Sequence, residues 1–257
     1  MTTNIQIIAS HHEHLARDAY TYMESLAQAI NFYDPISDLS LLNNSSKEKW
    51  VGIPKSLYAI LELSLKLQNE TNNLFRIDFE GLSKTPDGHH GITIKGNQTR
   101  LEKDTIINLS GIGKGYIVDK TFEYLEANGA QNILVNAGGD IRVKSIERPW
   151  KIGLTNPFKP SQIFGHINSA NSAIVSSGDY ARSIKTETGD KTTHFYDPKK
   201  KGYIDQTPYS SITVEGPSAA IAEVYAKCLM IDPSCKIKKA YNALAVDRQT
   251  KQVTRIR

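Results

Sequence analysis

Apolar positions recur every three or four residues in separate stretches of this chain, and each stretch predicts a helix. The first stretch carries this spacing at Ala16, Tyr20, Met23, Ala27 and Ile30. A short apolar run over residues 4–8 precedes it and predicts an opening strand. The polar residues 32–40, which are rich in turn formers, end the helical pattern. We therefore expect a strand, a helix and a turn in that order.

Further helices follow from the same spacing. The second is predicted to begin at Pro54, because proline suits the first helical position. Its inner face is expected to carry Leu57, Leu61, Leu65 and Gln68. A third helix is predicted over residues 114–128, where Asn128 and Gly129 supply a stop. A fourth is predicted over residues 218–230.

Short apolar segments between these helices predict strands. They cover residues 133–135, 141–143, 150–154, 173–175 and 212–214. The polar region 79–100 is expected to form a loop with short strands. Because strands and helices are mixed without a regular βαβ rhythm, the chain is assigned to the α+β class.

The composition is that of a globular protein. The chain has 257 residues, 39% of them hydrophobic and 23% charged, which suffices for one large domain or two intimately packed lobes. No stretch approaches the roughly 18–20 apolar residues that a membrane span needs. The first residues lack a basic start and a long apolar run, so no signal peptide is visible. We expect a cytoplasmic location, with export as the alternative if a leader was removed.

Charge and cysteine content exclude several classes of protein. The net charge is only +4, and the lysine clusters at residues 199–201 and 236–239 are interleaved with few aromatic residues, so no nucleic-acid surface is expected. A basic rim that attracts phosphate-bearing ligands remains compatible with this charge. Cys228 and Cys235 form neither a disulfide framework nor a metal motif. Cys228 is expected to be a small core residue.

The most informative segment for chemistry is residues 108–119, NLSGIGKGYIVD. Glycines at positions 111, 113 and 115 lead from an apolar strand into a helix, where backbone amides can approach a ligand closely. Lys114 offers a cation for a phosphate. Tyr116 stands where a dinucleotide fingerprint needs its third glycine, and the segment is not a P-loop either.

Two further segments each leave two interpretations open. Residues 136–140, NAGGD, form either a tight hairpin turn or a turn that brings backbone close to a flat ring. Residues 176–180, SSGDY, are expected to form a turn after an apolar strand. Their hydroxyl groups would bind a phosphate or cap the loop.

His194 is the candidate for acid–base chemistry. It precedes Asp197 by three residues, close enough in a turn for the carboxylate to orient the ring. A histidine held in this way can remove a proton from an attacking hydroxyl; a purely structural histidine is the alternative. The other histidines, including His11, His12 and His14, lack partners at metal spacing and are expected at the surface.

Taken in chain order, several of these segments resemble the ApbE-type FAD:protein FMN transferase family. The matching segments are 33–43 (YDPISDLSLLN), 108–116 (NLSGIGKGY), 135–141 (VNAGGDI), 177–180 (SGDY) and 194–198 (HFYDP). The resemblance extends from about residue 4 to 247. It implies a single ApbE-like domain over residues 1–257, in two intimately packed lobes.

The resemblance also implies an activity. Such enzymes bind FAD, cleave its pyrophosphate and attach FMN through a phosphoester to a Thr or Ser of a partner flavoprotein. Some members instead hydrolyse FAD to FMN and AMP. Magnesium bridges the pyrophosphate and neutralises charge. A third alternative is an FAD-binding protein that has lost catalysis.

By this resemblance, particular residues take particular roles. His194 would be the general base for the acceptor hydroxyl. The metal would be held by Glu223 and by the backbone carbonyl of Gly111. FAD would be bound by Tyr33, Leu74, Phe75, Arg76, Asn108, Lys114 and Tyr196.

The chain departs from the family pattern in several places. Asn108 and Arg76 stand where the family has Asp, residues 80–90 replace a longer stretch, and residues 1–3 are the nearest counterpart of a Met-Gly-Thr. On the last helix, Glu223 and Lys227 stand where the family presents Asp and Thr to the metal. Two alternatives follow. Either Glu223 still binds magnesium and Lys227 points away, or Lys227 takes over part of the charge neutralisation and metal dependence is weakened or lost.

Overall fold

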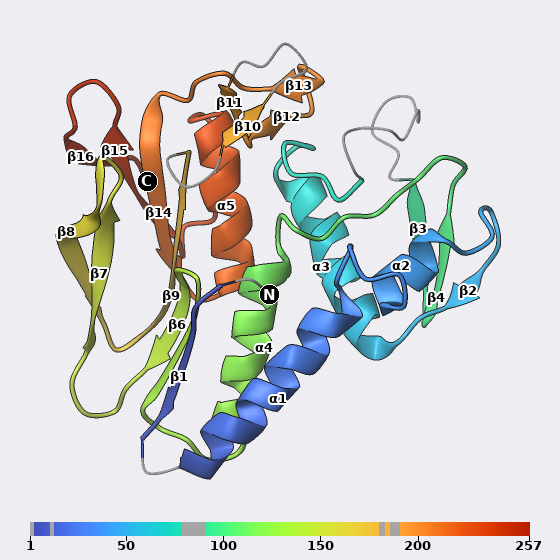
Figure 1. Ribbon diagram of the computed structural model, residues 1–257, viewed down its shortest axis with the longest axis horizontal. Helices are drawn as coiled ribbons and strands as arrows, with labels where there is room; N and C mark the ends of the chain where they lie inside the picture. Colours follow the sequence, from blue (N-terminus) through green and yellow to red (C-terminus); the bar gives the residue numbers. More distant parts are fainter. Residues whose placement is uncertain (1–2, 11–12, 79–90, 180–182, 186–190) are drawn as a thin grey trace.

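A seven-stranded antiparallel sheet is the centre of the computed structural model, which describes residues 3–10, 13–78, 91–179, 183–185 and 191–257 (Figure 1). The strand order is β1-β5-β6-β9-β14-β15-β16. Their bounds are β1 Ile5–Ala9, β5 Ile133–Ala137, β6 Asp140–Lys144, β9 Asn171–Gly178, β14 Tyr209–Gly216, β15 Asn242–Asp247 and β16 Val253–Arg255. Strands β5, β9 and β14 carry runs of buried side chains, as expected for strands covered on both faces.

Both faces of this sheet are covered. Helices α1 (Glu13–Ala29), α4 (Gly113–Ala127) and α5 (Ala219–Ile231) pack on one face and enclose the main core with it (Figure 1). The other face meets a long hairpin of β7 (Trp150–Asn156) and β8 (Lys159–Ser169). A smaller apolar cluster lies there, formed by Leu134, Val143, Ile152 and Ile174.

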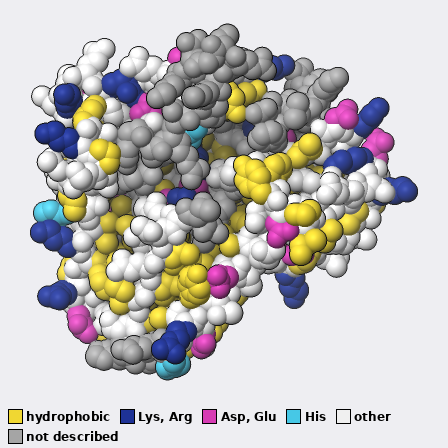
Figure 2. All heavy atoms as spheres, in the orientation of Figure 1, with side chains coloured by type: hydrophobic (Ala, Val, Ile, Leu, Met, Phe, Trp, Pro, Cys, Tyr) yellow, Lys and Arg dark blue, Asp and Glu magenta, His cyan; other side chains and the backbone are white. Residues whose placement is uncertain are grey.

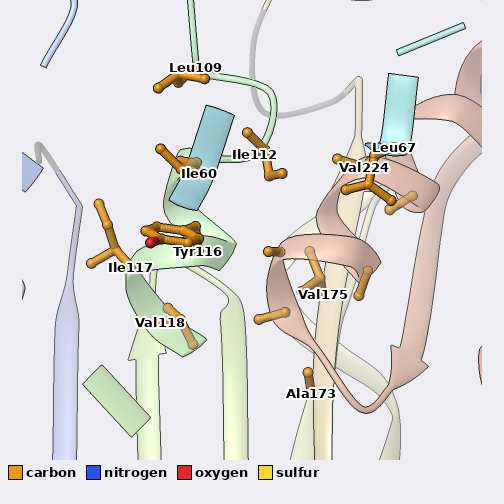
Figure 3. Packing of buried hydrophobic residues seen from close by; sticks show 14 of the residues in the cluster. Ile60, Leu67, Leu109, Ile112, Tyr116, Ile117, Val118, Ala173, Val175 and Val224 are labelled. Carbon is orange, nitrogen blue, oxygen red and sulfur yellow. The ribbon is translucent and has the colours of Figure 1, made fainter. Parts of the chain in front are cut away.

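A second lobe lies beside the helices on the right of Figure 1. It contains α2 (Asp38–Asn43), α3 (Lys55–Glu70) and a small sheet of β2 (Val51–Gly52), β4 (Gln98–Leu101) and β3 (Ile92–Lys95). Figure 3 shows Ile60 of α3 near Ile112 and Tyr116, at the start of α4, and Leu67 of α3 near Val224 of α5. One continuous core therefore joins the two lobes.

Helices α4 and α5 approach each other unusually closely at Gly115. A Cβ atom at this position would lie only 2.4 Å from the backbone oxygen of Ala219. The amide of Gly115 donates a hydrogen bond of 2.8 Å to Oε2 of Glu223. The missing side chain therefore lets a backbone amide of α4 reach a carboxylate on α5.

Asp119 fixes the start of α5 from the neighbouring helix. Its buried carboxylate accepts hydrogen bonds from the Ser218 hydroxyl at 2.7 Å and from the amides of Ala219 at 2.9 Å and Ala220 at 3.0 Å. Arg142 Nη1 on β6 lies 2.6 Å from the same carboxylate. An acid at a helix N-terminus satisfies amides that have no partner within the helix. Asp119 therefore ties α4, α5 and β6 together.

The helices that the sequence predicts are confirmed, with small shifts of their ends. Pro54 is the residue before α3 rather than its first residue, because its ψ of 151° is extended. Asn128 and Gly129, which has a φ of +91°, end α4 as expected. Ser218 caps α5 by accepting from the amide of Ile221. Within residues 32–40, the short helix α2 begins and was not predicted.

The predicted strands are also confirmed, but two long ones were missed. The hydrophobic pattern did not predict β8 or β15. It predicted a turn at residues 176–180, whereas residues 176–178 continue β9 because they pair with β14. Residue 180 and residues 79–90 lie outside the described part of the chain. Cys228 is buried as expected, and neither Cys228 nor Cys235 is in a disulfide.

Two small sheets complete the described fold. Strands β10 (Ser183–Lys185) and β11 (Lys191–Thr193) form one, and β12 (Tyr196–Asp197) and β13 (Gly202–Tyr203) form the other. Both lie near the C-terminal end of α5 in Figure 1. Among the described residues, no helix combines the length and apolar character that crossing a membrane requires.

Candidate active site

A cavity of about 610 Å³ gathers residues from segments far apart in the sequence. Every residue that the sequence analysis assigned to the site lines it: Tyr33, Leu74, Phe75, Arg76, Asn108, Gly111, Lys114, His194, Tyr196 and Glu223. In Figure 2, basic and acidic side chains lie together in a hollow near the centre of the face shown. The structure thus brings these residues together, while their individual roles stay predictions.

The hairpin between β5 and β6 forms one wall of the cavity. Gly138 and Gly139 make its turn with φ values of +60° and +96°, which favour glycine. A Cβ atom on Gly138 would also lie 2.0 Å from Oγ1 of Thr3, so the chain passes very close there. Residues 136–140 are therefore a tight hairpin turn, and Gly138 and Asp140 also line the cavity. The tight hairpin turn is thus confirmed, while the approach of this backbone to a flat ring stays a prediction.

Lys227 enters the cavity rather than pointing away from it. Its ammonium nitrogen lies 2.6 Å from Oε1 of Glu223. It also donates to the backbone oxygens of Gly111 at 3.0 Å and Ser110 at 3.2 Å. The Glu223 side chain is only 3% exposed and that of Lys227 26%. This is a partly buried pair within the site rather than a surface ion pair.

A second lysine–carboxylate pair lies on another wall. Nζ of Lys114, at the start of α4, is 2.7 Å from Oδ1 of Asp140, the first residue of β6. Oδ2 of Asp140 is buried without a hydrogen-bond partner among the described residues. Burial first, and then the negative charge of Glu223, raise the pKa of Asp140 to about 7, while Lys114 opposes the shift. The Asp140 carboxyl therefore titrates near neutral pH.

This raised pKa predicts a pH dependence of stability. Between its ordinary value near 4 and about 7, Asp140 keeps its proton in the folded protein but loses it in the unfolded chain. The unfolded state then binds fewer protons, so Asp140 lowers the free energy of unfolding as pH rises, by at most about 1.4 kcal/mol per pH unit. Urea denaturation at several pH values in this window measures the effect. The Asp140→Asn variant should lose less stability as pH rises; parallel profiles for the two proteins would contradict the assignment.

Aromatic side chains form the rim near His194. The His194 ring lies 4.2 Å from the ring of Phe195, and the rings of Tyr196 and Tyr203 meet edge to face at 5.4 Å. Oδ1 of Asp197 accepts hydrogen bonds from the amides of Lys199 and Lys200, at 2.9 and 3.3 Å. Asp197 thus stabilises the turn after β12. Its predicted role in orienting His194 stays a prediction.

Other lining residues come from the turn after α1, the segment after α3 and the approach to α4. Tyr33 is 87% exposed, so its ring is available to a ligand. Leu74 and Phe75 are buried, and a side chain on Gly111 would meet the Phe75 ring at 2.9 Å. Arg76 Nε donates to Oδ1 of Asp78 at 2.7 Å.

Asn108 uses its side chain to shape the turn before α4. Its Oδ1 accepts a hydrogen bond of 2.8 Å from the amide of Ser110. The adjacent backbone oxygens of Ser110 and Gly111 are those that Lys227 contacts. Asn108 therefore helps to present them to the cavity.

Sequence reasoning missed several residues of the cavity. Asp140 lay in a noted segment, but only the register of β5 and β6 places it beside Lys114. Asp78 and Tyr203 also line the cavity and belong to no recognised motif. Glu223 and Lys227 are four residues apart on α5, a spacing that allows the two side chains to pair, but this spacing gives no sign that Lys227 would contact residues 110 and 111.

The metal that the resemblance implies does not fit this arrangement of side chains. Magnesium takes oxygen ligands at about 2.0–2.1 Å in octahedral geometry. The Lys227 ammonium already lies between the Glu223 carboxylate and the Gly111 carbonyl, the two groups expected to hold the metal. A protonated lysine cannot ligate a metal. Among the described residues, no cluster of three or more His, Cys, Asp or Glu side chains could hold a metal ion.

The two lysine–carboxylate pairs and the glycine-rich start of α4 define a class of site. Backbone amides at a helix start and ammonium groups in a partly buried cavity are typical of a pocket for a phosphate-bearing ligand. Aromatic residues at the rim are suited to a flat ring.

Comparison with known proteins shows the family. The model of the ApbE family matches residues 1–249, so the chain belongs to the ApbE family. A curated Haemophilus influenzae protein named FAD:protein FMN transferase is 39% identical over 122 residues, which cover 46% of this chain and 35% of that protein. A Vibrio cholerae protein of the same name is 34% identical over 151 residues, or 56% of this chain and 44% of that protein. The matches thus span less than half the length of these relatives.

A solved structure shows the same fold. The ApbE protein of Thermotoga maritima superposes with a TM-score of 0.79 at 19% sequence identity, covering 98% of this chain and 91% of that one. The predicted α+β class and ApbE-like fold are therefore confirmed.

Proposed function

We propose that this chain, acting as a single domain, is an FAD:protein FMN transferase. It binds FAD in the cavity, cleaves the pyrophosphate and attaches FMN through a phosphoester to a Thr or Ser of a partner flavoprotein. One observation carries the proposal: residues that the family resemblance assigned to FAD and to catalysis, from separate segments, line one cavity. Membership of the ApbE family and the names of the curated relatives support it.

The side chains of the cavity suit this chemistry. In this proposal Lys114 and Lys227 neutralise the pyrophosphate, and Tyr33 and Tyr196 flank the flavin nucleotide; that all four line the cavity supports these roles. His194 takes the proton from the acceptor hydroxyl. The hydroxyl oxygen bonds to the FMN phosphorus, the bond from that phosphorus to the bridging oxygen breaks, and AMP leaves with that oxygen. Charge neutralisation and positioning are the main contributions of a protein to phosphoryl transfer.

The proposal is tested by incubating the protein with FAD, with and without a candidate flavoprotein that carries a Thr acceptor. FMN, AMP and covalently bound flavin are measured in each reaction. We expect AMP release coupled to covalent flavin on the acceptor, and no labelling of a matched acceptor whose Thr is replaced by Val. AMP and FMN released equally without an acceptor would indicate an FAD pyrophosphatase instead. FAD that stays bound and unchanged would indicate a binding protein without catalysis.

A further inference from the structure

The ammonium group of Lys227 occupies a small site built from oxygen atoms. Its acceptors are the backbone oxygens of Ser110 and Gly111 and Oε1 of Glu223, at 3.2, 3.0 and 2.6 Å. A lysine ammonium has three N–H donors, so this set can satisfy all of them. Carbonyl and carboxylate oxygens are also the groups that hard cations prefer. Lys227 thus supplies a cation, covalently attached to the protein, to a site that would otherwise attract a free one.

The surrounding contacts hold this arrangement in place. Oε2 of Glu223 accepts from the amide of Gly115, while Oε1 contacts Lys227, so both carboxylate oxygens are engaged. The close approach of α4 and α5 at Gly115 allows the first of these bonds. Since the Glu223 side chain is almost fully buried, it needs a compensating charge. Lys227 provides that charge without a metal.

A resident divalent ion would compete with this lysine. It would have to displace the ammonium from Gly111 and Glu223 and would then lie close to a like charge, which is unfavourable in a partly buried site. A phosphate oxygen, unlike a divalent ion, needs to replace only one of the three contacts of the Lys227 ammonium. It can replace the weakest of the three contacts, the 3.2 Å bond to Ser110, while Lys227 keeps its bonds to Gly111 and Glu223.

We propose that Lys227 is the built-in cation of this site, so that the chain binds the pyrophosphate of FAD without a divalent metal. The proposal rests on the proposed function, because it concerns the same cavity. Lys227 is a substrate-binding residue that replaces a metal ion. Lys114 is the second lysine that lines the cavity, and its ammonium is paired with Asp140.

The test compares FAD affinity in EDTA and in MgCl₂ by quenching of flavin fluorescence. For the wild-type protein we expect the two affinities to agree within about twofold. For Lys227→Thr we expect affinity in EDTA to fall by about tenfold or more, the usual effect of losing a hydrogen bond to a charged group. Because threonine offers a hydroxyl where the ammonium was, magnesium should restore much of that loss. Lys120→Thr, which removes the lysine of an exposed ion pair on α4, is the matched control and should behave like the wild type.

Each outcome decides a different point. Wild-type binding that needs magnesium would overturn the role of Lys227 and leave the proposed function intact. A wild-type protein that binds no FAD in either buffer would overturn both. Calorimetric titration of the wild-type protein with MgCl₂ alone is a second readout: heat of binding at a single site would contradict the proposal, even if Lys227→Thr fails to fold.

Discussion

Replacing His194 with Ala is expected to slow FMN transfer by about 10²- to 10⁴-fold, the usual contribution of a general base. FAD affinity should change little, because the expected cationic contacts of the pyrophosphate come from Lys114 and Lys227. Single-turnover formation of covalent flavin on the acceptor measures the rate, and fluorescence titration measures the affinity. His166→Ala is the matched control, since His166 is exposed on β8 and does not line the cavity.

Two results would argue against this role. A transfer rate equal to that of the wild type would remove His194 from the mechanism. An equal loss of FAD affinity and of transfer would make His194 a binding residue. The pH profile of transfer adds a further readout, since a general base should give a rate that rises with pH through its own titration.

Replacing Asp119 with Ala is expected to lower the free energy of unfolding by about 3–5 kcal/mol, as for other broken buried ion pairs. The change leaves Arg142 without its carboxylate and removes the acceptor for the amides of Ala219 and Ala220. Urea denaturation measures the loss. Asp18→Ala, an exposed position on α1, should stay within about 0.5 kcal/mol of the wild type.

The Asp119→Ala change should also weaken FAD binding in the cavity. Asp119 fixes the start of α5, which carries Glu223 and Lys227. An Asp119→Ala protein that keeps both wild-type stability and wild-type FAD affinity would show that this network does not position the site.

The hydrophobic pattern predicts the helices and most strands because each is a local property of the chain. The missed strands have weak local signals. In β8 most side chains are exposed and polar residues interrupt the apolar ones, since it forms a hairpin with β7 at the edge of the fold. In β15, alanines stand at buried positions where strands favour branched or aromatic residues. Pairing with β14 outweighs that low propensity.

The sequence predicts the contacts within the cavity less completely than it predicts the fold. Family resemblance selects the lining residues, but spacing alone does not show which of them touch. Lys227 reaches residues 110 and 111 only because a glycine at position 115 lets α4 and α5 approach closely. The pair of Lys114 and Asp140 likewise depends on how the β5–β6 hairpin packs against α4. Such contacts between distant segments are set by packing and carry no local signal.

The most direct test of the FAD site is a crystal structure of the protein grown with FAD. The account predicts electron density for FAD in the cavity, with the pyrophosphate in contact with Lys227 and Lys114 and the flavin ring beside the rim formed by Tyr33 and Tyr196. An empty cavity at saturating FAD, or FAD bound elsewhere on the surface, would contradict it.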